Sequence, residues 1–145
     1  MPQIIKNKVH AMAIVAVAIA LLALPGCFGG GSVDDARATQ LEAAATTWVA
    51  GMEGLTLELS SILNESTAFR SLAAVRGHIR ELQAAIEPLG ELDDNDASYV
   101  ESKFGGELKE LWSAFSPQAQ RVTITGGIPT EISELLRELP EFGPR

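Results

Sequence analysis

Cysteine and histidine are scarce in this chain, and their scarcity removes several kinds of chemistry. The 145 residues include one cysteine and two histidines. A single thiol forms no internal disulfide, no thiolate zinc site, no CxxC redox pair and no CxxCH haem attachment. His10 lies close to the N-terminus and leaves His78 alone in the rest of the chain, which excludes a multi-histidine zinc or copper site. We therefore expect neither a metal nor another cofactor.

Catalytic and nucleotide-binding patterns are missing as well. The serines of the helical segments have no GxSxG context, the stretch GGELKE lacks the GxxxxGK[ST] of a phosphate-binding loop, and no Glu-x-x-His motif supports a di-iron site. Glutamates are numerous enough for a paired-carboxylate glycosidase, but they lie off the apolar stripes of the predicted helices, where a solvated face explains them. We therefore expect a protein that is not an enzyme.

Basic residues are outnumbered by acidic ones, 11 against 19, which gives a net charge of −8. A chain of this charge repels a phosphate backbone, so nucleic acid is not an expected partner. The acidic run ELDDND suggests calcium, but an EF-hand loop starting at Asp94 places Tyr99 where glycine is needed and Gly105 where the bidentate glutamate belongs. Capping of the next helix by Asp94 or Asp96 is the interpretation we favour.

The N-terminus has the three parts of an export signal. Two lysines, Lys6 and Lys8, lie in a polar start, an apolar run of fourteen residues extends from Ala11 to Leu24, and two small residues separate this run from Cys27. Crossing the hydrocarbon core of a bilayer takes a helix of about twenty residues. A permanent transmembrane span is therefore the weaker interpretation.

The sequence Leu24-Pro25-Gly26-Cys27 resembles the lipobox of bacterial lipoproteins, with an aliphatic residue three positions before the cysteine and glycine directly before it. Pro25 stands where alanine, serine or threonine is commoner. The resemblance implies that the signal peptide is cut before Cys27 and that this residue carries a thioether-linked diacylglycerol. Two acyl chains anchor a protein stably, so the implied location is a membrane of the cell envelope, after export. The alternative is an incidental cysteine close to a cleaved signal.

The resemblance ends at Cys27, and no family is identified for the remainder of the chain. In Gram-negative lipoproteins, aspartate after the cysteine favours the inner membrane, and Phe28 in this place favours the outer membrane with the body facing the periplasm. The sequence thus divides into a signal peptide at 1–26, a lipid-bearing cysteine with a flexible glycine linker at 27–32, and a body at 33–145 without a further boundary or repeat.

Two apolar stripes of the body alternate spacings of four and three residues, which predicts two amphipathic helices. The first stripe is Leu41, Ala45, Trp48, Met52, Leu55, Leu59 and Ile62, and the second is Ala68, Leu72, Val75, Ile79, Leu82, Ile86 and Leu89. Folded back on each other, the stripes pair layer by layer, Trp48 with Leu82 for example, as in an antiparallel hairpin. Ser32 is the predicted cap of the first helix, and Gly51 and Gly54 permit a neighbour to approach closely.

Two more helices follow in the predicted fold. A stripe from Val100 to Val122 predicts a long third helix, with a kink or a restart at Ser116-Pro117 because proline lacks a backbone N–H. The stretch RVTIT at 121–125 reads as a frayed helix end or an extended linker, and a short last helix begins at Thr130. The predicted fold is all-α, an antiparallel bundle of three long helices and one short C-terminal helix.

Three groups of side chains are candidates for binding. The aromatic residues Trp48, Trp112, Phe104 and Phe115 form plain core or line a ligand cavity, and we favour core. Three arginines of the second helix, Arg70, Arg76 and Arg80, pair across the hairpin with the acidic first helix or bind an anionic partner. His78 is expected opposite Glu53, in a surface hydrogen bond or weak ion pair rather than as a general base.

The sequence therefore predicts a non-enzymatic, lipid-anchored envelope protein whose helical bundle is an interaction or scaffold module. Its expected partners are the membrane, through Cys27, and an unidentified protein. Two alternatives stay open: a carrier or sensor that holds a small apolar ligand in the bundle core, and a parallel coiled-coil oligomer built on the first stripe.

Overall fold

The computed structural model describes residues 32–142, and within them it contains helices and no strand. The helices are α1 (Asp35–Ser61), α2 (Glu65–Ile86), α3 (Asp94–Ile124) and α4 (Thr130–Arg137), with a short 3-10 turn, η1 (Glu87–Leu89), after α2. The expected all-α fold of three long helices and one short helix is confirmed for this part of the chain. The predicted signal peptide and Cys27 lie outside the described residues.

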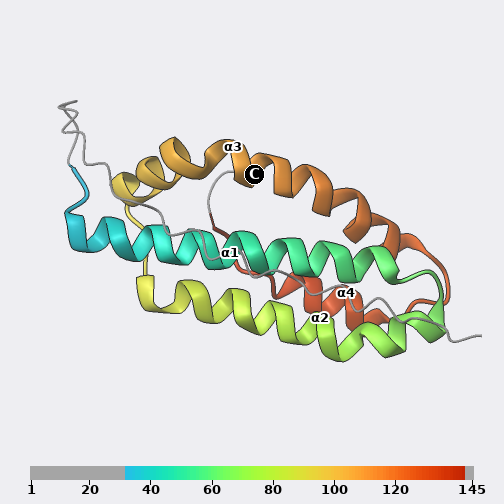
Figure 1. Ribbon diagram of the computed structural model, residues 1–145. Coiled ribbons are helices and arrows are strands. Elements are labelled where there is room, and N and C mark those ends of the chain that lie inside the picture. Colours follow the sequence, from blue (N-terminus) through green and yellow to red (C-terminus); the bar gives the residue numbers. More distant parts are fainter. Residues whose placement is uncertain (1–31, 143–145) are drawn as a thin grey trace, which may run out of the picture.

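The three long helices lie side by side and alternate in direction, with α1 against both α2 and α3 (Figure 1). The main contacts join α1 to α2, α1 to α3, α2 to α4 and α3 to α4, so the four helices form a ring. The fourth member of this ring is only eight residues long. It therefore covers only a part of the bundle's length, where it contacts both α2 and α3.

The predicted stripe of α1 is the centre of the core. All seven of its members have an exposed fraction of 0%, and they are covered by α2 and α3 of the same chain. On the second stripe, Ala68, Val75, Ile79 and Leu82 are buried, whereas Leu72 and Ile86 are partly buried. A stripe that is fully covered within one chain has no surface left for a parallel coiled coil, so the structure disfavours that assembly.

Glycine brings α1 and α2 close together. A Cβ atom added at Gly51 would lie 2.7 Å from Leu82 Cδ2, and one added at Gly54 would lie 2.7 Å from His78 Cε1. Leu82 thus lies against Gly51, one helical turn from its predicted partner Trp48. The antiparallel hairpin and the close approach at both glycines are confirmed.

The helical glycines differ in what surrounds them, which predicts opposite effects of alanine. Gly106→Ala, with nothing within 4 Å of the added atom, is expected to stabilise the protein by about 0.5–1 kcal/mol through helix propensity. Gly51→Ala is expected to destabilise it by about 1 kcal/mol, because the added methyl overlaps the buried Leu82 side chain. The cost of this overlap is expected to exceed the gain in helix propensity. Urea unfolding measures both values. Equal stability of the two variants would contradict the close α1–α2 approach.

The first helix begins later than predicted. Its cap is Asp34 and not Ser32: the Asp34 carboxylate accepts a hydrogen bond of 2.8 Å from the backbone N–H of Arg37. A carboxylate is as good a cap as a hydroxyl and suits the positive end of the helix dipole. The predicted turn before α2 is confirmed, with Asn64 and Thr67 forming a reciprocal capping box.

The third helix is capped by Asp93, one residue before the predicted candidates. Its carboxylate accepts from the N–H groups of Asn95 and Asp96, each at 2.8 Å. The predicted cap Asp94 is the first helical residue, and Asp96 completes the capping box from inside the helix at 3.4 Å from the Asp93 N–H. The acidic run is thus a helix start, as expected, but with a different residue as its cap.

Of the two outcomes predicted at Pro117, a kink or a restart, the restart is wrong, because α3 continues through this residue as one helix. Phe115 and Val122, on either side of the proline, are both buried in the core, and this packing holds both halves in one helix despite the lost hydrogen bond. Figure 1 shows α3 as an arch over α1. The stretch RVTIT is the last turn of α3, capped by Thr125, and is not an extended linker. The next turn uses Gly127 at φ +83°.

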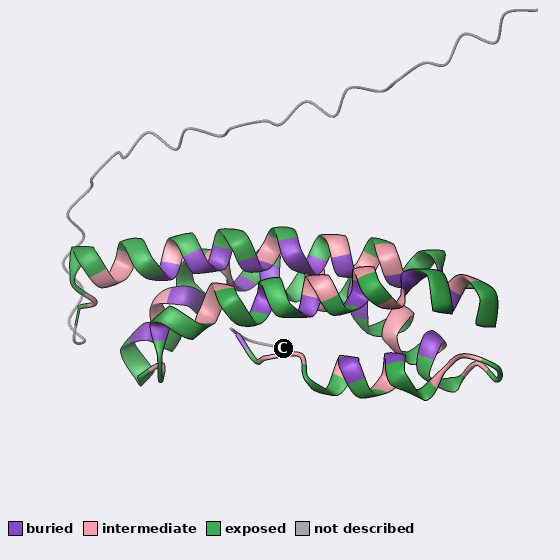
Figure 2. Ribbon diagram, turned by 90° about the horizontal axis from the view of Figure 1, so that it is seen from below, coloured by how far each residue is buried: buried purple, intermediate pink, exposed green. Residues whose placement is uncertain are grey.

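The chain after α4 returns to the core. Phe142 lies at the end of an irregular segment, yet only 2% of this residue is exposed, and its ring centroid lies 5.6 Å from that of Trp48. Figure 2 colours the chain after α4 as intermediate and exposed, and only the end of the described part as buried. No pattern in the sequence predicts this contact. None of the helices in residues 32–142 has the length and apolar character needed to span a bilayer.

Candidate functional site

The main candidate is a groove of about 650 Å³ between α1 and α3. Its lining comes from one face of each helix: Glu53, Thr56, Leu57 and Ser60 of α1, and Glu107, Glu110, Leu111, Ala114 and Gln118 of α3. The fourth helix, α4, contacts α2 and α3 but contributes no residue to the lining of this groove. Leu57, in the groove, has an exposed fraction of 71%.

The groove combines an apolar surface with charge of one sign. Leu57, Leu111 and Ala114 supply the apolar part, and three glutamates lie among the lining residues, which include no lysine, arginine or histidine. Within residues 32–142 no three acidic, histidine or cysteine side chains are placed to hold a metal ion. The groove therefore suits an apolar ligand that carries positive charge.

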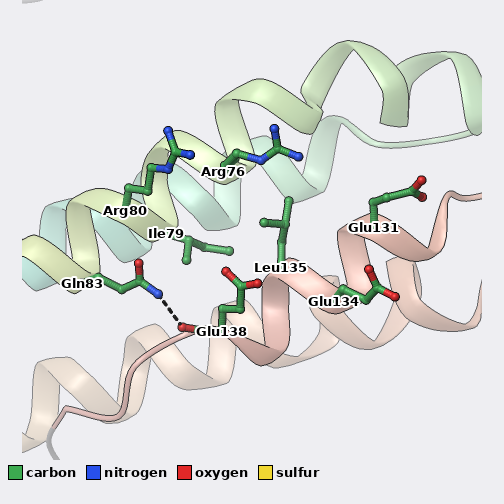
Figure 3. Close-up of a pocket in the computed structure, with 8 residues that line it drawn as sticks. All are labelled: Arg76, Ile79, Arg80, Gln83, Glu131, Glu134, Leu135 and Glu138. Carbon is green, nitrogen blue, oxygen red and sulfur yellow. Dashed lines mark hydrogen bonds between the residues drawn. The ribbon is translucent and has the colours of Figure 1, made fainter.

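A second hollow, of about 330 Å³, lies between α2 and α4 and contains both signs of charge (Figure 3). Arg76 and Arg80 line its α2 side, and Glu131, Glu134 and Glu138 line its α4 side. The hydrogen bond across it runs from Gln83 Nε2 to the backbone oxygen of Glu138, at 3.1 Å. A surface so mixed is a weaker candidate for either an anion or a cation.

The arginines do not pair with α1 as the favoured interpretation required. Arg76 and Arg80 line the same hollow as the glutamates on its α4 side, and Arg70 donates to Ser66 Oγ within α2 at 3.1 Å. The reason is that α4 lies on a side of α2 away from α1, which the hairpin register does not determine. The glutamates of α4 also make this side a poor binding face for an anionic partner.

The predicted contact between His78 and Glu53 is not formed. His78 lies against Gly54, with Nδ1 3.6 Å from Glu81 Oε2 on its own helix. Glu53 instead faces α3 in the groove. The two residues lie near the same level of the hairpin but on different sides of α1.

The aromatic residues are mainly core, as expected. Trp48 and Phe115 are buried, Phe104 is partly buried, and Trp112 stacks edge-on against Phe115 with ring centroids 5.4 Å apart. Trp112 also borders a surface hollow on α3, together with Lys109, Ser113 and Ser116. Phe142 lies beside Trp48, where a carrier would hold its ligand.

An ion pair that the sequence did not reveal ties α1 to α3 at the end where both helices begin. Arg37 Nη2 lies 2.6 Å from Asp96 Oδ2 and also donates to the Leu89 carbonyl at 2.9 Å, while Nε contacts both carboxylate oxygens at 3.2 Å. Asp96 is only 5% exposed. The hydrogen bond from Arg37 lowers the pKa of Asp96 against the opposing effect of burial.

A second tie joins the same helices one layer further along. The Glu42 carboxylate accepts from the Lys103 ammonium and from the Tyr99 hydroxyl, the latter at 2.5 Å. The hydrogen bond from Lys103, followed by that from Tyr99, lowers the pKa of Glu42, and burial is the main cause that raises the pKa of Tyr99. These groups lock α1 to α3 and do not line the groove.

The opposite end of the same helix pair is held by Arg121. Its guanidinium donates to the carbonyls of Ile62 and Leu59, at 2.5 and 2.7 Å, and so supplies partners for the last carbonyls of α1. Polar contacts thus join α1 and α3 at both ends of the pair, on either side of the groove. Comparisons of the chain with protein families, curated proteins and solved structures found no match.

Proposed function

We propose that the protein is a non-enzymatic, lipid-anchored interaction module of the cell envelope, held to a membrane by a diacylglycerol on Cys27. The observation that carries this proposal is the location of the exposed large apolar side chains. Leu57, Leu63, Phe69 and Ile124 have exposed fractions of 57 to 74%, and all four lie towards the end of the bundle where α1 passes into α2 and α3 ends. Exposed apolar surface is typical of protein-binding sites.

The place of the anchor fits this arrangement. Cys27 precedes the start of α1 by eight residues, so the lipid would enter at the opposite end of the bundle. Gly29, Gly30 and Gly31 lie in this stretch, and a glycine-rich spacer would let the bundle stand off the membrane, with its apolar end directed towards a partner. If the host is Gram-negative, we place the protein at the outer membrane, facing the periplasm.

The test of the anchor is metabolic labelling with a fatty acid in a bacterial host. The wild-type chain is expected to take up label and to lose residues 1–26, whereas Cys27→Ala abolishes labelling and leaves an unprocessed or released product. Ser32→Ala, five residues further on, is the matched control and keeps the label. An intact mass of wild-type protein that equals the bare polypeptide would contradict the proposal.

A carrier or sensor of a small apolar ligand is the second candidate. It is favoured by the indole N–H of Trp48, which is buried without a hydrogen-bond partner among residues 32–142, next to a ring supplied by the C-terminal segment. A ligand that displaced Phe142 would find both an aromatic surface and a free donor. Native mass spectrometry of protein purified from its own cells tests this role, and a spectrum without any bound small molecule counts against it.

A further inference from the structure

We propose that the α1–α3 groove binds a basic amphipathic helix of a partner protein. The inference rests on the proposed function, because it names the chemistry of the partner that the interaction module would take. It is carried by the shape of the groove, by its exposed leucine and by its charge.

The length and the walls of the groove suit a bound helix. Its α1 wall runs from Glu53 to Ser60 and its α3 wall from Glu107 to Gln118, which at about 1.5 Å per residue correspond to two to three helical turns. Both walls use residues spaced three and four apart, so both present a single face. A helix with apolar residues at the same spacing buries that face when it lies along the groove.

Leu57 is the main exposed apolar residue of the groove. Its side chain has an exposed fraction of 71%, and Leu111 and Ala114 lie on the facing helix. Elsewhere α1 turns its large apolar residues inward, and its buried stripe needs nothing from the groove. The leucine therefore contributes no core packing that would account for it, and covering it would remove apolar area from water.

The charge of the groove selects the partner. Glu53, Glu107 and Glu110 lie among the lining residues without a cationic neighbour in that set, so lysines or arginines on a bound helix would find three carboxylates. A second copy of this acidic chain would bring glutamate against glutamate unless it used one of its few basic residues. The α2–α4 cleft, with two arginines facing three glutamates, has no such preference.

The experiment uses the mature chain from residue 27 with Cys27→Ser, so that no lipid competes for the probe. The probe is a synthetic amphipathic helix with leucine at the i, i+3, i+4 and i+7 positions and lysine elsewhere, and its matched control carries glutamate in place of lysine. Calorimetric titration is expected to show saturable binding of the lysine peptide, weakened by salt, and no binding of the glutamate peptide. Equal binding of both peptides, or of neither, overturns the proposal.

Two pairs of variants test the groove itself. The triple variant Glu53→Gln, Glu107→Gln, Glu110→Gln is expected to raise the Kd of the lysine peptide about tenfold, since exposed ion pairs each contribute modestly. The matched triple Glu131→Gln, Glu134→Gln, Glu138→Gln, on α4, removes the same charge and is expected to change the Kd by less than about twofold. Equal effects of the two triple variants would mean that the lysine peptide is attracted by the net charge alone, and would overturn the groove as its binding site.

The second pair isolates the apolar contact. Leu57→Ser is expected to raise the Kd about tenfold, while Leu57→Met, which keeps an apolar side chain of similar size at the same place in the groove, leaves it nearly unchanged. Equal effects of the two variants on the Kd would overturn the proposed binding of a helix in this groove. A dimer of this chain in sedimentation would also overturn it, if the triple variant of Glu53, Glu107 and Glu110 dissociates that dimer. Loss of peptide binding with fatty-acid labelling intact would refute this inference and leave the anchor standing, and the reverse result would refute the anchor alone.

Discussion

Replacing Phe142 with alanine is expected to lower the free energy of unfolding by about 3–5 kcal/mol. The ring is 2% exposed and lies against the fully buried Trp48, so the substitution removes apolar burial and leaves a cavity beside the largest core side chain. Domains of this size have a total stability of about 5–15 kcal/mol. The loss of one ring near the C-terminus is thus expected to remove a large part of the free energy of unfolding. Urea unfolding of the mature chain with Cys27→Ser measures this loss.

The matched control is Phe69→Ala, the same chemical change at a residue that is 57% exposed. We expect it to cost less than about 1 kcal/mol, as for most surface substitutions. A double-mutant cycle with Trp48→Ala is expected to give a coupling of about 0.5–1.5 kcal/mol, because the two rings contact each other directly. If Phe142→Ala were no more damaging than Phe69→Ala, the C-terminal segment would not be docked in solution.

Phe142 also marks a limit of what the sequence predicts. It follows Pro140 in a segment too short for any helical period, so nothing local distinguishes it from a solvated tail residue. The stripe of α1 was predictable in full because alternating spacings of four and three are a local property of one helix, and burial follows from them. The burial of Phe142 depends instead on where in the bundle α4 ends and on the direction that the chain takes from there.

Contacts between helices were predictable only where one short turn joins them. The α1–α2 hairpin follows from the turn at Asn64, and it brings Gly51 against Leu82. The side of α2 on which α4 lies depends on packing across the whole bundle, so the predicted partners of Arg76 and Arg80 were wrong. For the same reason no local pattern predicts the groove, whose two walls are separated along the sequence by about half the described chain.

Pro117 shows a local rule overruled by packing. Proline lowers the stability of a helix interior by removing one hydrogen bond and crowding the preceding turn, and for this reason the sequence predicted a kink or a restart. The buried residues Phe115 and Val122 lie on both sides of it within one continuous helix. Burial of two large side chains, worth about 1.5–3 kcal/mol each, is comparable to the penalty of about 3 kcal/mol for a proline.

Asp96→Ala is expected to lower the free energy of unfolding by about 2–3 kcal/mol. The carboxylate accepts hydrogen bonds from Arg37 and completes the capping box of α3, and its removal leaves the guanidinium without its main partner. The control is Asp94→Ala at the exposed neighbouring position, where we expect less than about 1 kcal/mol from the lost helix-dipole interaction. Equal losses at the two positions would contradict the Arg37–Asp96 tie.

The same tie predicts how stability depends on acid. Because Arg37 lowers the pKa of Asp96 in the folded state, the stabilisation is complete above the unfolded pKa, about 3.9, and is lost as the pH falls through the lower folded pKa. Asp96→Asn removes this titration while keeping the size of the side chain, so the difference in unfolding free energy between wild type and variant is expected to shrink below about pH 4. Glu42, whose pKa is also lowered, is present in both proteins and cancels in that difference. A difference that stays constant as the pH falls through this range would mean that the Asp96 carboxylate owes no stability to its charge.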